Sequence, residues 1–212
     1  AMKLEYVHRN VARLVDPPRY TPRERNVWTA EEVQRFLEAT KSHRYYGLFL
    51  ILFHYGLRRG EATGLRWKDV DFDKDVIHVR QQVYYVGHTQ AIGELKTPES
   101  RRDLVLTPEI KEVLLAERIR RGYPDENETL YLSNRGNPVE GRTLIQLFKK
   151  LATDIGLEPI TIHEIRHTFT SLLHSGGVSP KVAQGILGHR SIVTTLQVYT
   201  HSTKEERADA VT

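Results

Sequence analysis

The chain has 212 residues, of which 39% are hydrophobic and 27% are charged, with a formal net charge of +4. This composition is ordinary for a soluble globular protein and argues against disorder over most of the chain. Because the sequence contains no cysteine, disulfide scaffolds, thiolate metal sites and cysteine nucleophiles are excluded. The longest apolar run, residues 45–57, is interrupted by Gly47, His54 and Gly56 and is too short to cross a bilayer. We therefore expect a cytoplasmic protein without a membrane partner.

The first 26 residues differ in composition from the rest of the chain. They carry three prolines and six basic residues against three acidic ones, with little periodicity. We interpret residues 1–26 as a linker or arm that joins an upstream domain missing from this sequence. A frayed terminus would have the same composition. Residues 27–212 are expected to form one domain.

The hydrophobic pattern of that domain predicts helices on either side of a small sheet. Thr29 followed by Glu31 and Glu32 is typical of a helix start. Further helices are predicted at about residues 44–55, 59–65, 108–121, 144–155, 163–174, 179–187 and 192–198. Alternating apolar residues predict strands at 76–86, 90–95 and 102–106, joined as a three-stranded antiparallel meander. The expected fold class is α+β, mainly α, with Trp28 and Trp67 in the core.

The predicted helix at 163–174 begins with HEIRH, which matches the zinc-protease pattern H-E-x-x-H. A zinc hydrolase also needs a third ligand, and no acidic residue occurs between Glu164 and Glu205. Arg166 would lie on the same helical face as the two histidines, where its charge opposes a dication. We therefore expect no metal and no cofactor, and keep a zinc hydrolase only as an alternative.

Without a metal, the same helix has a polar stripe made of His163, Arg166, His167 and Thr170. Arginine donates paired hydrogen bonds to phosphate, and histidine transfers protons near neutral pH. The stripe therefore suits a phosphate substrate. A solvated helix face has the same pattern and is the commoner explanation when such a stripe is taken alone.

Other segments carry residues of the same kind in a definite order. They are YGLRRGE at residues 55–61, LGH at 187–189 and TLQVYTH at 195–201. Together with HEIRH, these segments resemble the tyrosine recombinase (phage integrase) family, whose motifs are T-G-L-R-x-x-E, H-x-x-R-H, L-G-H and a tyrosine shortly afterwards. Ten positions separate His189 from Tyr199, in keeping with that pattern. Tyr55 departs from the family's threonine or small residue, at a position that is not catalytic.

The resemblance covers about residues 27–201 and implies roles for individual residues. The implied catalytic residues are Arg58, Lys96, His163, Arg166, His189 and Tyr199, with Glu61 orienting an arginine or histidine. The two arginines and His189 would donate to the phosphate, and Tyr199 would be the nucleophile. His163 would accept a proton, and Lys96 would protonate the departing 5′ oxygen. Lys96 is assigned from KTPESRR at residues 96–102, which matches the K-T-x-x-S-x-R form of mobile-element integrases.

The function that this resemblance implies is site-specific DNA recombination, for integration or excision of a mobile element. Residues 27–212 would be the catalytic domain, and the arm would lead from an upstream DNA-binding domain. The implied partner is double-stranded DNA, bound by a homotetramer on paired sites, although this chain alone could be a monomer. The protein would be cytoplasmic and associated with the nucleoid when bound to DNA. A type IB topoisomerase that relaxes DNA, and a DNA-binding module that has lost catalysis, are the remaining alternatives.

Overall fold

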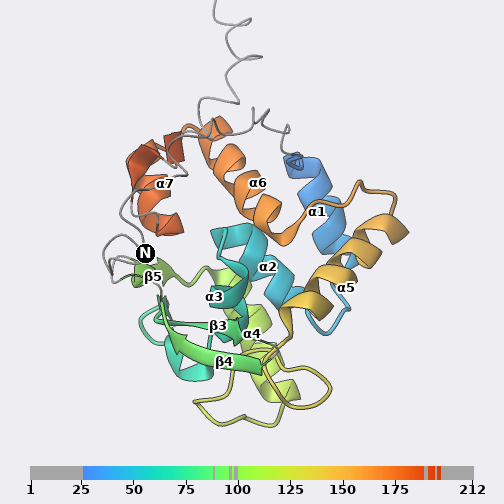
Figure 1. The fold of residues 1–212 in the computed structure, drawn as a ribbon, viewed down its shortest axis with the longest axis vertical. Coiled ribbons are helices and arrows are strands. Elements are labelled where there is room, and N and C mark those ends of the chain that lie inside the picture. The colour runs from blue at the N-terminus through green and yellow to red at the C-terminus, as the bar shows by residue number, and fades with distance from the viewer. Residues whose placement is uncertain are drawn as a thin grey trace, which may run out of the picture.

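A computed structural model describes residues 26–87, 89–95, 97, 100–188, 191–193 and 195–196 (Figure 1). The helices are α1 (Ala30–Ala39), α2 (Tyr46–Tyr55), α3 (Arg59–Gly64), α4 (Pro108–Arg120), α5 (Gly141–Asp154), α6 (Ile162–Ser175) and α7 (Pro180–Leu187). The strands are β1 (Val70–Asp71), β2 (Val76–Val79), β3 (Gln81–Val86), β4 (Thr89–Glu94) and β5 (Arg102–Val105). None of the helices in these ranges combines the length and apolar character needed to cross a membrane.

The helix α2 is the centre of the fold because its sequence, YGLFLILFHY, is apolar on every side. Such a helix must be covered on all faces, and α1, α3, α4 and α6 all pack against it (Figure 1). Phe53 of α2 stacks on Trp28, with ring centroids 5.6 Å apart. Trp28 and Trp67 are both buried, which confirms their predicted place in the core.

The helices agree with their predicted positions to within about one turn. Thr29 and Glu32 form a capping box at the start of α1, as the sequence indicates. The helix α5 begins at Gly141, three positions before the first apolar residue of the predicted helix. Of the predicted helix at 192–198, only residues 192, 193, 195 and 196 are described, and all four are helical.

The predicted fold class is confirmed, but the predicted meander is wrong. The three-stranded antiparallel sheet has the order β1-β2-β5, while β3 and β4 form a separate hairpin. The predicted strand 76–86 is divided at Arg80, whose guanidinium donates to the carbonyl oxygen of Arg102 at 2.9 Å and to the Asp103 carboxylate. The alternation of apolar residues resumes after this break, so periodicity alone predicts one strand where there are two.

The strand β3 turns away from the sheet and packs on α3. A Cβ atom at Gly60 would lie 2.4 Å from the carbonyl oxygen of Val83, and one at Gly64 would lie 3.0 Å from the Cα of Gln82. Because these neighbours are backbone atoms, a side chain at Gly60 would force the main chain of β3 to shift, and one at Gly64 would be in unusually tight contact with it. The two glycines therefore allow the β3–β4 hairpin to lie directly against the helix that begins after Arg58.

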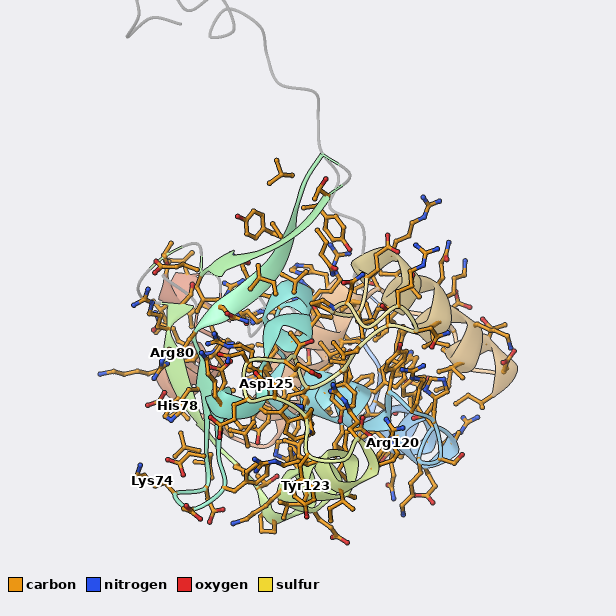
Figure 2. All side chains as sticks on the ribbon, turned by 90° about the horizontal axis from the view of Figure 1, so that it is seen from below. Lys74, His78, Arg80, Arg120, Tyr123 and Asp125 are labelled. Carbon is orange, nitrogen blue, oxygen red and sulfur yellow. The ribbon has the colours of Figure 1, made fainter. Side chains whose placement is uncertain are left out.

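A charged cluster on the exposed face of the sheet joins β2 to β5. The Nδ1 atom of His78 lies 2.8 Å from the Oδ1 atom of Asp103, and Arg80 pairs with the same carboxylate. Figure 2 shows His78 and Arg80 close together at this edge of the molecule. Hydrogen bonding from His78, supported by Arg80, lowers the pKa of Asp103 against the opposing effect of burial. Since neighbouring residues of a strand face opposite sides, Arg102 points inward.

Candidate active site

Arg58 lies in the turn between α2 and α3. The preceding helix ends at Gly56, which has a left-handed φ of 57°. A Cβ atom at Gly56 would lie 2.5 Å from the Phe169 ring and 3.0 Å from Leu187. Glycine is therefore required both by the backbone conformation and by close packing of α6 and α7. The Arg58 side chain, which is 41% exposed, extends from this tightly packed turn.

The carboxylate of Glu61 is buried beneath Arg58, with only 1% of its side chain exposed. Its Oε1 atom accepts a hydrogen bond from Arg58 Nη1 at 2.8 Å, and its Oε2 atom accepts from the Arg58 backbone N–H at 3.1 Å. Oε2 also accepts from Nη2 of Arg102 at 2.8 Å. Burial raises the pKa of Glu61, but Arg102 and then Arg58 outweigh it and hold the pKa below its ordinary value. Glu61 is therefore an anion at neutral pH that contacts two arginines.

Arg166 is held inside the molecule by α6. This helix starts with a capping box in which Thr161 and Glu164 exchange hydrogen bonds. Only 4% of Arg166 is exposed, and its Nη1 and Nη2 atoms donate to the carbonyl oxygens of Gly56 and Leu187, each at 2.7 Å. Burial, followed by the repulsion of Arg58, lowers the pKa of Arg166 to about 9. The guanidinium stays protonated at neutral pH.

The end of α7 completes the described part of the site. Gly188 has a φ of 66°, and a Cβ atom there would lie 2.9 Å from Nη1 of Arg102. The carbonyl oxygen of Gly188 also accepts a hydrogen bond from Nη2 of Arg58 at 3.4 Å. The glycine of the L-G-H motif therefore allows Arg102 to approach the end of this helix, where Arg58 also donates to the main chain.

The structure brings Arg58, Glu61 and Arg166 together, while His163 lies on the exposed side of α6. The imidazole rings of His163 and His167 are perpendicular, with centroids 4.7 Å apart. Three predicted catalytic residues, Lys96, His189 and Tyr199, lie outside the described residues. Their assignments stay predictions.

Arg102 is a site residue that sequence reasoning missed. It is the last residue of KTPESRR, and the family resemblance implies no role for it. The pattern of residues 102–106 contains a usable signal, because Arg102 alternates with Leu104 and Leu106 and so shares their inward face. An arginine in the register of a core face needs a buried partner, and that partner is Glu61.

Two residues of the HEIRH segment make contacts within the fold. The Glu164 carboxylate accepts a hydrogen bond from the backbone N–H of Thr161 at 2.6 Å. Arg166, from the middle of the segment, is directed into the core. Within the described ranges, no three His, Cys, Asp or Glu residues come together as a metal site would require.

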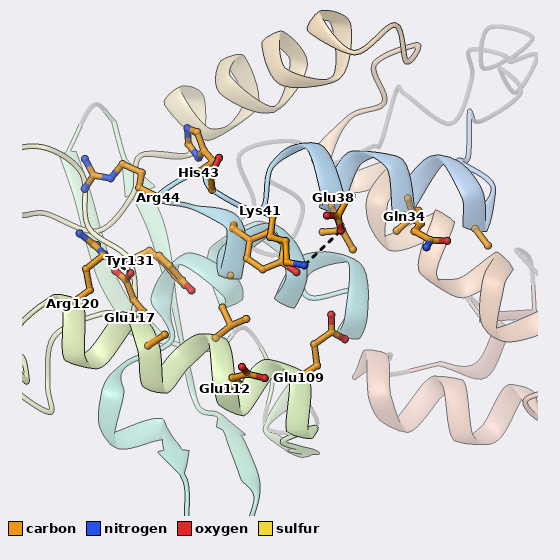
Figure 3. A pocket seen from close by; sticks show the side chains of 18 of the residues that line it. Gln34, Glu38, Lys41, His43, Arg44, Glu109, Glu112, Glu117, Arg120 and Tyr131 are labelled. Carbon is orange, nitrogen blue, oxygen red and sulfur yellow. Dashed lines mark hydrogen bonds and ion pairs between the residues drawn. The ribbon is translucent and has the colours of Figure 1, made fainter.

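A cavity of about 900 Å³ lies elsewhere, beside α1 and α4 (Figure 3). Its walls carry charges of both signs, including the ion pair between Lys41 and Glu38 at 3.7 Å. None of the predicted site residues that the structure describes lines this cavity. The arginine site and the cavity are thus separate features.

Comparison with known proteins gives the same assignment as the motifs. The model of the Phage integrase family matches residues 26–206. A tyrosine recombinase XerC-like protein of Caldanaerobacter subterraneus subsp. tengcongensis is 31% identical, over 85% of this chain and 51% of that protein. The transposase from transposon Tn916 of Enterococcus faecalis is 28% identical, over 84% of this chain and 48% of that protein. The chain spans about half the length of the curated relatives that it matches.

Solved structures share the fold. The Tn1549 transposon integrase in complex with transposon right end DNA is similar with a TM-score of 0.76 and 25% identity, covering 100% of this chain and 75% of that chain. XerA recombinase is similar with a TM-score of 0.70 and 29% identity, covering 92% of this chain and 65% of that chain. Since the family model covers residues 26–206, the chain belongs to the phage integrase family of tyrosine recombinases.

Proposed function

We propose that this chain is the catalytic part of a site-specific DNA recombinase, an integrase that cleaves and rejoins strands through a 3′-phosphotyrosyl intermediate. One observation carries the proposal: Arg58 and Arg166 are held at one place by Glu61 and by the ends of two helices. Transposon-encoded relatives favour integration or excision of a mobile element. Relatives solved with DNA favour double-stranded DNA as the partner.

The two arginines suit the charge that develops during phosphodiester cleavage. Donors held in place in advance stabilise a transition state without reorganising, and removal of one such donor typically costs about 10²–10³ in rate. Arg58 is partly exposed and can reach a phosphate. The bonds of Arg166 to two carbonyls orient its guanidinium, whose five donors allow phosphate contacts in addition. Arg58 and Arg166 would therefore bind the non-bridging oxygens.

The net charge of the cluster also favours an anion. Arg58, Arg102 and Arg166 contribute three positive charges, and Glu61 contributes one negative charge. Burial and the repulsion of Arg58 both lower the pKa of Arg166, so the positive charge of Arg166 is disfavoured at this position. A bound phosphodiester would relieve this repulsion. The favourable interaction with the arginines would thus act on the phosphate that reacts.

The chemical steps follow from the residue types and the family resemblance. The Tyr199 oxygen attacks phosphorus while His163 accepts the phenolic proton, and a P–O bond to tyrosine forms. The bond to the 5′ oxygen breaks, and Lys96 donates the proton that this oxygen needs. His189 supplies a further hydrogen-bond donor. Since one phosphodiester replaces another, a new 5′-hydroxyl can reverse the step without ATP.

The same proposal extends to the assembly and to the rest of the chain. Residues 27–212 would act as the catalytic domain, and residues 1–26 as an arm from an upstream DNA-binding domain. We expect a homotetramer on paired DNA sites, with the isolated chain as a monomer. The protein would work in the cytoplasm, at the nucleoid. The extra length of the relatives supports the idea of an additional domain.

Covalent capture tests this function directly. The protein is mixed with a pool of nicked duplexes whose sequence around the nick is random, and denaturation-resistant adducts are recovered and sequenced. We expect an enriched sequence, with DNA attached at Tyr199 by mass spectrometry. A plasmid with two copies of that sequence should then yield recombinants. No adduct, or attachment at another residue, would contradict the proposal, and relaxed plasmid without recombinants would indicate a topoisomerase.

A further inference from the structure

The buried guanidinium of Arg102 contacts several parts of the site. Only 6% of the Arg102 side chain is exposed. Its Nη2 atom donates to Glu61 at 2.8 Å, and its Nε atom donates to the carbonyl oxygen of Ile186 at 2.6 Å. Its Nη1 atom donates to the carbonyl oxygen of Ser100 at 3.0 Å. Gly188 lies against the same group. The side chain thus connects β5, α3 and α7.

Each of these contacts leads to a predicted catalytic residue. Glu61 binds Arg58, Ile186 lies three positions before His189 in the sequence, and Ser100 lies four positions after Lys96. We infer that Arg102 is a positioning residue for strand cleavage, which holds the Glu61 carboxylate against Arg58 and ties together the segments on either side. This inference rests on the proposed function. Each of the three guanidinium nitrogens of Arg102 already donates to a protein acceptor, so we assign it no contact with DNA.

Arg102 also helps to keep the Glu61 carboxylate ionised. The carboxylate of Glu61 faces Arg58 from the turn, Arg102 from β5 and Arg166 from α6. With Arg102 present, two arginines pair with Glu61, so its carboxylate stays ionised and holds Arg58 in place. Without Arg102, Arg58 alone would pair with this buried carboxylate. The pKa of Glu61 would rise, because burial would act against fewer opposing charges.

A double-mutant cycle separates positioning from folding. The proteins are wild type, Arg102→Met, Glu61→Gln and the double variant, with Arg102→Lys as the conservative change. On the captured nicked duplex, single-turnover adduct formation is measured at saturating protein from pH 6 to pH 8. DNA affinity and thermal unfolding are measured in parallel.

We expect Arg102→Met to slow adduct formation by about 10–100-fold, the usual range for a supporting residue, with DNA affinity little changed. The loss should grow toward pH 6, because protonated Glu61 releases Arg58. Arg102→Lys should recover part of the rate. In the Glu61→Gln background, removal of Arg102 should cost little more and add no pH dependence.

The inference would be overturned if removal of Arg102 slowed adduct formation by the same factor in the wild-type and Glu61→Gln backgrounds. It would also be overturned if DNA affinity fell as much as the rate of cleavage. If Arg102→Met does not fold, Arg102→Lys in the wild-type and Glu61→Gln backgrounds gives the same cycle. A wild type that forms no adduct contradicts the proposed function instead. In that case a ¹³C NMR titration of the Glu61 carboxyl still decides whether Arg102 controls it, since an unchanged pKa in Arg102→Met would overturn the contact's role.

Discussion

The guanidinium of Arg166 donates a hydrogen bond to the carbonyl oxygen of Gly56, 2.7 Å away and 110 residues earlier in the chain. Its second bond, to Leu187, reaches the end of α7. Helix C-termini carry partial negative charge, so two helix ends stabilise one buried cation. The placement of Arg166 therefore depends on the packing of α2, α6 and α7 together.

We expect sulfate, an analogue of the phosphodiester, to stabilise the protein through these arginines. Sulfate should raise the unfolding temperature above the value in chloride of equal ionic strength. Binding to the folded state contributes about 1 kcal/mol when sulfate reaches a few times its dissociation constant. Because sulfate also stabilises proteins in general, Arg58→Gln is the control. An equal increment in that variant would show that sulfate does not bind at the arginine site.

Tyr199→Phe should abolish the covalent link to DNA and leave non-covalent binding nearly unchanged. The substitution removes the attacking hydroxyl and retains the ring, so packing is preserved. Denaturing gels of the captured duplex measure the link, and a mobility shift measures binding. An adduct formed by the phenylalanine variant would rule out Tyr199 as the nucleophile.

Strand cleavage should persist in a chelator. The arginine cluster supplies the positive charge that a metal ion supplies in other phosphoryl-transfer enzymes, and Glu164 is engaged in capping α6. Adduct formation is compared in EDTA, in buffer and with added zinc. Loss of activity in EDTA and its return with zinc would restore the zinc interpretation of HEIRH.

Lys96→Ala should cleave ordinary DNA about 10²–10⁴-fold more slowly, the range for general acid–base catalysis. On a 5′-bridging phosphorothioate, most of this loss should vanish, because a sulfur leaving group departs without a proton. Arg58→Ala is the comparison, since transition-state charge needs stabilisation with either leaving group. Equal defects of Lys96→Ala on both substrates would indicate a backbone contact instead.

Gly60→Ala should destabilise the protein by about 1–3 kcal/mol, the usual cost of overpacking. The added methyl would lie 2.4 Å from the carbonyl oxygen of Val83. The matched control is Gly185→Ala in α7, where nothing lies within 4 Å of the new methyl and helix propensity predicts a gain of up to about 1 kcal/mol. Urea denaturation measures both. Similar changes in the two variants would contradict the proposed backbone contact.

The helices and the two site arginines could be predicted from the sequence because their causes are local. Thr29 caps α1, and Gly56 ends α2 where only a left-handed residue fits. The order of the motifs along the chain is enough to single out Arg58 and Arg166. Strand pairing depends on contacts distant in the chain, so the alternation across Arg80 suggested one strand where there are two.

The role of Arg102 was hidden for the same reason. Its partner Glu61 is 41 residues away, and neither residue's neighbours indicate the pairing. Only the inward register of Arg102 with Leu104 hints that a buried anion is needed. Long-range polar contacts of this kind require the fold itself.

The contact of Gly60 and Gly64 with β3 has a mechanical consequence. Protein interiors absorb small displacements largely by rotamer changes and repacking of side chains. The contact between β3 and α3 has the main chain of β3 on one side and glycine on the other, so no side chain lies between them to repack. We therefore expect a displacement of the β3–β4 hairpin to press directly on the first turn of α3 through Gly60. That turn starts at the residue after Arg58. A shift of the hairpin is thus expected to change the position of Arg58.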